Sequence, residues 1–254
     1  MRGYSSEAVS GTSALFPEAV TPLLEGRFGT PYLYREVCES TQELVRDLPE
    51  GAVAATDNQT AGRGRRGRQW VSAPRTGVLF SLSLWPATPA ERLAPFSLVL
   101  AEAVCEALDE RAAVRWPNDV VVDGRKLAGV LPEVRGGQLI AGIGINADAT
   151  AEQLPAEARV PPTSLRLLRG EPVDRAAVLA SVLLAVERRY DTFERDGFTG
   201  LGRNELAGRT VRLAGGGEGR VDSVDAEGRL VVNGVAHASA EVERVEVSPP
   251  RSTT

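Results

Sequence analysis

Two tight turns in the middle of the chain place the strongest limit on how it can fold. An Asp-Gly pair at 123–124 separates the apolar segments 119–122 and 125–134, and a Gly-Gly pair at 136–137 leads into a third segment, 138–146. Such pairs favour the two-residue turns that join neighbouring antiparallel strands. We therefore predict three consecutive strands in antiparallel order near the centre of the sequence.

Helix and strand patterns on both sides of these turns predict an α+β fold. Apolar residues recur at helical spacing across 91–110. A second long helix, across 175–195, is expected to begin after Asp174 and to end at Gly197. Further strands are expected at 31–37, 51–56 and 77–85.

A short helix is expected directly after the first of these strands. The sequence STQE at 40–43 has the spacing of a capping box, in which the Ser and Glu side chains satisfy free backbone N–H groups. This helix would run to about Leu48, before Pro49 stops it.

Changes in composition along the chain predict three regions. Residues 1–29 are small, polar and rich in proline, and are expected to form a tail that either docks or hangs free. Residues 30–203 carry the helix and strand pattern of one main domain, with 147–173 wrapping its surface. Residues 204–254 are expected to form a small β-barrel and a tail. The β segments expected there are 210–213, 220–224, 230–232 and 242–247.

The ionisable residues exclude several classes of protein. A formal net charge of −5 argues against a general nucleic-acid binder, which usually carries excess positive charge. The single histidine, His237, argues against a His-ligated metal centre or a Ser-His-Asp triad, and we expect it to lie exposed in a turn. Few cysteines, no export signal and no long apolar run predict a cytoplasmic protein outside the membrane.

A basic loop follows the strand predicted at 51–56. The segment GRGRRGR at 62–68 holds four arginines and three glycines. Glycine lets the backbone approach a ligand closely, and arginine forks bind phosphate or carboxylate through paired hydrogen bonds. The loop therefore predicts a site for a dense anion that orders on binding. A Walker-type phosphate loop is excluded, because no Gly-Lys-Ser/Thr follows, whereas a solvated loop or an RNA-binding arm stays open.

One lysine stands among the 29 basic residues. Lys126 opens the segment KLAGVL at 126–131, shortly after RWPND at 115–119. Because every other basic position is arginine, this lysine indicates a site that needs a compact ammonium rather than a planar fork. The alternatives are a solvated edge charge for Lys126 and a simple turn cap for the Asn and Asp.

Alternating glycines leave one face of the strand at 141–146 bare. Its sequence, AGIGIN, predicts either a ligand that lies flat against the backbone or tight packing. A dinucleotide fingerprint is excluded, because the third glycine and the following helix are missing.

Together and in this order, these motifs resemble those of the biotin protein ligases, which attach biotin to carrier domains of carboxylases. The resemblance covers about residues 30–200, and the β region after 205 is similar to the family's C-terminal barrel. It implies a catalytic domain like that of the class II aminoacyl-tRNA synthetases, with a mixed, largely antiparallel sheet and helices. It also implies that the small domain is a Src-homology-3-like β-barrel.

The resemblance further implies a two-step reaction. The carboxylate of biotin attacks the α-phosphate of ATP, giving biotinyl-5′-AMP and pyrophosphate, with Mg²⁺ accompanying the nucleotide. The ε-amine of a lysine on a biotin carboxyl carrier domain, in acetyl-CoA carboxylase or a related carboxylase, then attacks the mixed anhydride and releases AMP.

The same resemblance implies roles for individual residues. Lys126 would lie between the biotin carboxylate and the α-phosphate, Arg65 would contact the phosphate, and Asp119 would orient or deprotonate the incoming amine. The residues expected to bind biotin are Ser40, Thr41, Gln42, Gln59, Arg63, Gly64, Arg65, Lys126, Gly129, Gly142 and Gly144. Those expected to bind ATP or the adenylate are Arg63, Arg65, Trp70, Asn118, Lys126 and Asn146. No protein ligand to a metal is expected.

The chain departs from the family pattern in two places. Arg115 stands where relatives usually have a lysine before WPND, and too few residues precede Pro31 for the helix-turn-helix domain that many relatives carry. We therefore expect a short-form ligase without DNA binding, as a monomer or a homodimer. Two alternatives remain, a lipoate-type ligase with the same adenylate chemistry and an RNA-binding module.

Overall fold

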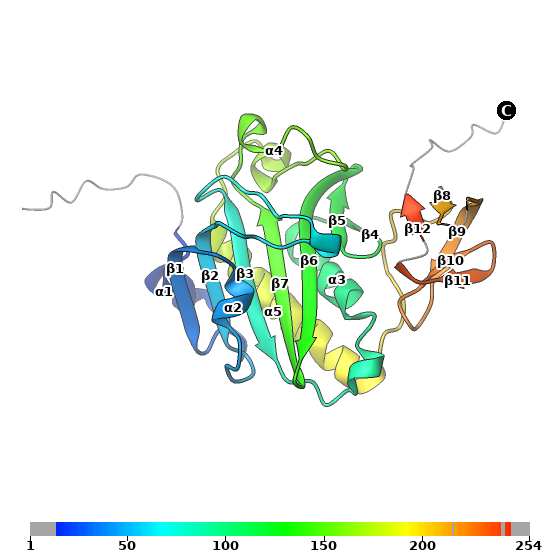
Figure 1. The fold of residues 1–254 in the computed structure, drawn as a ribbon. Coiled ribbons are helices and arrows are strands. Elements are labelled where there is room, and N and C mark those ends of the chain that lie inside the picture. Colours follow the sequence, from blue (N-terminus) through cyan, green and yellow to red (C-terminus); the bar gives the residue numbers. More distant parts are fainter. Residues whose placement is uncertain (1–13, 215, 240–241, 245–254) are drawn as a thin grey trace, which may run out of the picture.

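The computed structural model describes residues 14–214, 216–239 and 242–244, and its larger part is a seven-stranded sheet (Figure 1). The strands are β1 (Tyr32–Cys38), β2 (Val53–Gln59), β3 (Gly77–Leu84), β4 (Ala113–Arg115), β5 (Asp119–Val122), β6 (Arg125–Arg135) and β7 (Gln138–Asn146). They lie in the order β1-β2-β3-β7-β6-β5-β4. Only β1 and β2 pair in parallel within this sheet, and β5, β6 and β7 form the predicted antiparallel series. The predicted mixed, largely antiparallel sheet is confirmed.

The two long helices cover one face of this sheet. The helices are α1 (Pro17–Val20), α2 (Thr41–Leu44), α3 (Phe96–Leu108), α4 (Leu165–Arg169) and α5 (Arg175–Asp196). Figure 1 shows α3 and α5 packed together behind the sheet, with α2 in front of it. Among the described residues, no helix is both long and apolar enough to cross a membrane.

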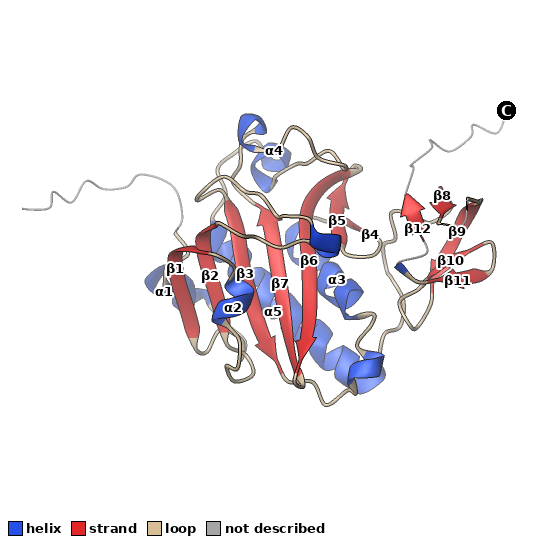
Figure 2. Ribbon diagram, in the orientation of Figure 1, coloured by secondary structure: helices blue, strands red, loops and turns tan. Residues whose placement is uncertain are grey.

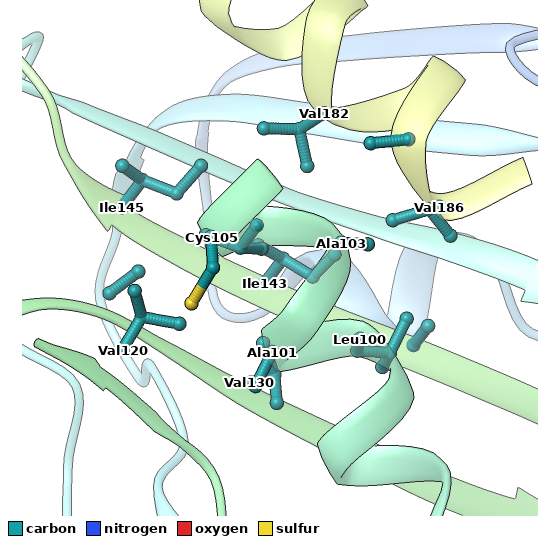
Figure 3. Close-up of a cluster of buried hydrophobic side chains, with 14 of the residues drawn as sticks. Leu100, Ala101, Ala103, Cys105, Val120, Val130, Ile143, Ile145, Val182 and Val186 are labelled. Carbon is teal, nitrogen blue, oxygen red and sulfur yellow. The ribbon is translucent and has the colours of Figure 1, made fainter. Parts of the chain in front are cut away.

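The alternation of side chains in β7 separates the core from the opposite face of the sheet. Ile143 and Ile145 are buried in the core with Val182 of α5 and Leu100 of α3 (Figure 3). Because successive strand residues face opposite sides, the intervening Gly144 faces away from this core. The sheet thus has a packed apolar face and a second face with bare backbone.

A second, five-stranded antiparallel sheet follows along the chain, beside the β4 end of the large sheet (Figure 2). Its strands are β8 (Thr210–Leu213), β9 (Glu218–Val224), β10 (Leu230–Val232), β11 (Val235–His237) and β12 (Val242–Arg244), in the order β11-β10-β9-β8-β12. Arg115 on β4 donates two hydrogen bonds to the Glu205 carboxylate, at 2.9 and 3.0 Å. The indole N–H of Trp116 also donates to the carbonyl of Gly228, between β9 and β10, at 2.9 Å, so the large sheet is tied both to the segment before β8 and to the small sheet.

Helix boundaries differ from the sequence prediction where proline and long-range contacts intervene. The helix expected across 91–110 begins only at Phe96, after Pro95, because the residue before a proline is disfavoured in helical conformation. Helix α2 ends at Leu44 rather than near Leu48. The predicted capping box is wrong: Ser40 occupies the N-cap without a side-chain cap bond, and Glu43 instead accepts a hydrogen bond from Arg63.

Other differences concern elements that carry weak sequence signals. The sequence patterns do not predict strand β4, strand β11 or helix α4, and α4 lies within the segment 147–173 that is expected only to wrap the surface. His237 is half-buried on β11 rather than exposed in a turn. Leu15 and Phe28, from the region expected to form a tail, are buried in the main core. Residues 245–247 of the last predicted β segment lie outside the described residues.

Candidate active site

One cavity on the α2 side of the large sheet gathers the motif residues. Its lining includes every residue expected to contact biotin, ATP or the adenylate except Asn146, together with Asp119. Asn146 is buried, and its side-chain amide donates to the carbonyl of Lys126 at 3.3 Å. Asn146 therefore supports the strand that carries Lys126.

One end of the cavity is a buried polar group, which we call the polar end (Thr41, Gln59 and Ser81). The backbone N–H of Thr41 donates to Oε1 of Gln59 at 2.9 Å, and the hydroxyls of Thr41 and Ser81 lie 2.8 Å apart. Thr41 and Ser81 are 3% and 0% exposed. Because Oε1 of Gln59 is already used, its amide NH₂ is the part of Gln59 that stays available as a donor to a ligand.

Ser81 also lines the cavity, although none of the sequence motifs includes it. It lies on β3 in the segment FSLSL, where serines and apolar residues alternate. Such alternation indicates a strand with one polar face, and this pattern is the sequence signal that points to Ser81.

Gln42 fastens helix α2 to the sheet at the same end of the cavity. Its side-chain Nε2 donates to the carbonyl of Leu131 at 2.9 Å, directly above Gly142. A Cβ atom at position 142 would lie 2.9 Å from that nitrogen. Glycine at 142 therefore permits the close approach of the helix.

The arginine loop (residues 62–69) closes the cavity from above. The backbone N–H of Gly64 donates to the carbonyl of Arg68 at 2.7 Å, which closes the loop on itself. Its side chains have partners outside the loop: Arg63 bonds to Glu43, and Arg65 donates to the Ser239 hydroxyl at 2.8 Å.

Electrostatics favour an anion beneath this loop. Burial, followed by the positive charges of Arg66 and Arg68, lowers the pKa of Arg65, and the negative charge of Asp119 opposes that shift. A guanidinium whose pKa is lowered by like charges would be stabilised by a bound anion. The residues of the loop therefore suit phosphate or carboxylate.

Lys126 and Asp119 form an ion pair on the cavity wall. The Lys126 ammonium donates to Oδ1 of Asp119 at 2.7 Å, and the two side chains are 26% and 18% exposed. Lys126 Nζ also lies 5.4 Å from the ring centroid of Trp70, within the range of a cation–π contact. Asn118 is held nearby, because its side-chain amide donates to the carbonyl of Val130 at 2.9 Å.

A β-bulge aims Lys126 into the cavity. Lys126 and Gly129 both line the cavity although they are three residues apart, and a regular strand would point them to opposite faces. The register between β5 and β6 shifts here: Val121 pairs with Lys126, but Val120 pairs with Ala128. The extra residue reverses the alternation and brings both positions to one face.

A second, more basic cavity adjoins the first. It shares Arg65, Arg68, Asn118 and Asp119 with the first cavity. It adds Arg66 from the loop, Arg115 from β4 and Arg159 from the 147–173 segment. The two cavities together suit a ligand that carries several negative charges.

Carboxylates are scarce around both cavities. Asp119 is the single acidic residue among the described residues that line the first cavity. No described part of the chain holds a group of three or more His, Cys, Asp or Glu side chains placed to bind a metal ion. A divalent ion here would depend chiefly on ligands supplied by a substrate.

Comparisons with known proteins agree with the geometry. Residues 34–149 match the model of the biotin/lipoate A/B protein ligase family. The chain is 35% identical to the bifunctional ligase/repressor BirA of Bacillus subtilis over 229 residues, which cover 80% of this chain and 70% of that protein. It is 33% identical to the biotin–[acetyl-CoA-carboxylase] ligase of Paracoccus denitrificans, over 76% of this chain and 89% of that protein.

A solved structure shows the same fold. The biotin protein ligase from Aquifex aeolicus, in complex with biotin and ATP, superposes with a TM-score of 0.69 and 29% sequence identity, covering 84% of this chain and 94% of that one. The fold class that the motif resemblance implied is thereby confirmed.

Proposed function

This chain belongs to the biotin protein ligase family, and from that premise we propose that it activates biotin with ATP and transfers it to a lysine of a carrier domain. One observation carries the proposal: a single cavity places the polar end beside Lys126 and the arginine loop. The first group suits a neutral ring with N–H and C=O groups. The second suits two anions that must approach one another.

The polar end would bind the ureido ring of biotin. The free amide NH₂ of Gln59 matches the ureido oxygen, and the hydroxyls of Thr41 and Ser81 can accept from a ureido N–H. Ser40 and Gln42 complete this end, with the backbone of Arg63 and Gly64 closing it. A lipoyl ring offers neither a ureido oxygen nor an N–H, so the lipoate-type alternative fits this end poorly.

Lys126 and Arg65 would carry the adenylation step. A carboxylate oxygen of biotin attacks the α-phosphorus of ATP, and the bond from that phosphorus to the bridging oxygen of the β-phosphate breaks. The ammonium of Lys126 offsets the repulsion between the two anions, while the Arg65 fork stabilises charge on the phosphate. Pyrophosphate would leave through the adjoining basic cavity, which Arg66 and Arg115 help to line. Trp70 and Asn118 would line the place of the adenosine part of the adenylate.

Transfer to the carrier would follow at the same place. The lysine amine of the carrier attacks the carbonyl carbon of the mixed anhydride, an amide forms, and the C–O bond to AMP breaks. Asp119 would orient or deprotonate the amine once Lys126 contacts the substrate anions. Because the cavity offers a single carboxylate, Mg²⁺ would be held chiefly by the nucleotide phosphates and water, and it would offset phosphate charge.

The partner and the compartment follow from this chemistry. We propose a biotin carboxyl carrier domain of acetyl-CoA carboxylase or a related carboxylase as the acceptor, in keeping with the Paracoccus denitrificans relative. A net charge of −5 speaks against nucleic acid as a partner. The free thiols of Cys38 and Cys105 fit the reducing cytoplasm.

Isotope exchange between ATP and pyrophosphate tests the proposal. We expect exchange that depends on biotin and is unaffected by lipoate. Exchange with lipoate alone would assign the chain to the other branch of the family, and no exchange with either acid would overturn the proposed function.

A further inference from the structure

A pair of glycines opposite one another on β6 and β7 lies beneath the Trp70 side chain. Gly129 and Gly144 are direct partners in the antiparallel register. A Cβ atom at Gly144 would meet its three nearest atoms at 2.6, 2.9 and 3.0 Å, and all three belong to the Trp70 indole. A Cβ atom at Gly129 would lie 3.0 Å from the same ring. These bare positions are therefore covered by the protein's own side chain.

The indole on this surface also confines Lys126. The Lys126 Nζ atom lies 5.4 Å from the Trp70 ring centroid and would be 3.3 Å from a Cβ atom at Gly129. The ammonium is thus held between the indole, the bare backbone and the Asp119 carboxylate. A ring that stood higher above the sheet would leave Lys126 without one of these walls.

Trp70 joins this surface to the arginine loop. Its backbone N–H donates to the carbonyl of Gly62 at 3.0 Å, which fixes the base of the loop. Its buried indole Nε1 has no hydrogen-bond partner among the described residues. A buried donor without a partner is costly, so this N–H is suited to an acceptor that a ligand supplies.

We propose that Gly129 and Gly144 are positioning residues that form a seat for Trp70, so that closure of the arginine loop sets the place of Lys126 for adenylation. This inference rests on the proposed function for its catalytic consequence. It assigns the two glycines to the nucleotide step rather than to the ring of biotin. Gly142, two residues from Gly144 on the same face, meets Gln42 instead and serves as the matched control.

A double-mutant cycle tests the seat. Gly144→Ala and Gly142→Ala are each made with Trp70 and with Trp70→Ala, and biotin-dependent ATP–pyrophosphate exchange is measured at varied ATP. Because an added methyl in a tightly packed place forces the neighbour to move, we expect Gly144→Ala to lower kcat/KM for ATP by about tenfold when Trp70 is present. The KM for biotin should change much less. In the Trp70→Ala background, the effect of Gly144→Ala should fall to at most about twofold.

Gly142→Ala should behave differently, with the same effect in both backgrounds. Equal losses from Gly144→Ala with and without Trp70 would overturn the inference, because the glycine would then act on the strand or on the ligand directly. Thermal unfolding of each variant separates these results from a failure to fold. Gly129→Ala provides the milder second variant, because a Cβ atom at position 129 would lie 3.0 Å from the ring, against 2.6 Å at position 144.

Tryptophan fluorescence tests the seat without catalysis. The difference between the emission of the native chain and that of Trp70→Ala isolates the Trp70 signal. With the seat intact this signal should be blue-shifted and poorly quenched by acrylamide, and Gly144→Ala should shift it to the red and expose it. An unchanged signal would refute the seat even if exchange fell. If the native chain shows no exchange, the proposed function fails while the fluorescence result still decides whether the seat exists.

Discussion

The two ends of the cavity are held together in different ways. At the polar end, Thr41 and Ser81 are almost fully buried, and Thr41 bonds both to Ser81 and to Gln59. At the other end, the arginine loop is largely exposed, and Arg63 forms an exposed ion pair with Glu43. Buried hydrogen bonds between regular elements hold one geometry, whereas exposed ion pairs exchange partners at low cost. The polar end therefore suits selection of a substrate, and the loop suits a step in which charges move.

The largest expected loss of activity comes from changing Lys126, which lies on the cavity wall outside the polar end. Lys126→Arg keeps the charge but replaces a compact ammonium with a wide fork that does not fit between the substrate anions. We expect the chain to fold normally, with a loss in exchange rate of about 10²–10³-fold. Circular dichroism and ATP–pyrophosphate exchange measure the two outcomes.

The neighbouring residue supplies the control for that substitution. Arg125 is exposed and its fork bonds to the carbonyl of Pro162, so Arg125→Lys should leave exchange unchanged. Undiminished turnover in Lys126→Arg would show that any cation suffices at this position.

Breaking the polar end should weaken biotin binding without slowing the saturated enzyme. Ser81→Ala removes the hydroxyl that lies 2.8 Å from the hydroxyl of Thr41. The buried Thr41 hydroxyl then loses this hydrogen-bond partner. At about 1–3 kcal/mol for such a loss, the KM for biotin should rise by about tenfold or more. Steady-state exchange at varied biotin measures it.

Ser83 offers a matched comparison on the same strand face. Its hydroxyl donates to the carbonyl of Leu48 at 2.8 Å and accepts from Gln138, away from the cavity. Ser83→Ala should lower the melting temperature but leave the KM for biotin unchanged. Equal KM increases in both variants would mean that the polar end does not select the ring.

Substrates should change the loop more than the polar end. Without ligands, trypsin is expected to cleave within residues 62–69, where Arg63, Arg66 and Arg68 are exposed. With biotin plus ATP at about 100 times their dissociation constants, the open population and the cleavage rate should fall by about 100-fold. Mass spectrometry of timed digests identifies the cut sites. Cleavage at equal rates with and without ligands would contradict ordering on binding.

The contact between Glu43 and Arg63 should have the smallest effect. Burial opposes ionisation of Glu43, but the hydrogen bond and charge of Arg63, with the charge of Arg46, outweigh it and lower the Glu43 pKa. An exposed pair of this kind contributes about 0.2–1 kcal/mol, so Glu43→Gln should speed loop opening by no more than about fivefold at neutral pH.

The pH dependence of this contact has a definite sign. Because the pKa of Glu43 is lowered in the folded protein, its contribution is present at neutral pH and is lost as the pH falls through that lowered value, below the ordinary 4.5. Hydrogen exchange of the loop in the native chain and in Glu43→Gln should therefore differ at pH 7 and converge under acid conditions. Glu36→Gln, which breaks an exposed pair with Arg75, is the control. A difference that persists at low pH would show that Glu43 acts through something other than its charge.

The sequence was sufficient to predict that the motifs share one site, but not how the side chains of that site are oriented. Strands 119–122 and 138–146 have the predicted bounds, because tight turns and apolar alternation are local signals. The bulge that aims Lys126 into the cavity depends on pairing between β5 and β6, which no local pattern reports.

Long-range pairing also explains the error at the helix start, and it identifies the side chains that approach the glycine face. Glu43 follows Ser40 at capping-box spacing, yet its carboxylate is used by Arg63, twenty positions away in the chain. The bare face of AGIGIN predicts a flat-lying ligand or tight packing; Gly144 meets Trp70 and Gly142 meets Gln42, and both glycines also line the cavity. A glycine pattern shows that something approaches the backbone closely; only the tertiary structure shows what it is.

The ion pair between Lys126 and Asp119 bears on how such an enzyme avoids being acylated by its own intermediate. A mixed anhydride acylates amines, and the only lysine of this chain lies on the wall of the cavity where the anhydride would form. The Lys126 ammonium donates to the Asp119 carboxylate at 2.7 Å and would donate to the substrate anions once they bind, and an ammonium has no free electron pair with which to attack. The group that we propose helps to make the reactive intermediate would thereby be kept from consuming it. With arginine at every other basic position, the chain offers the intermediate no further lysine to acylate, and the activated acid is preserved for the carrier.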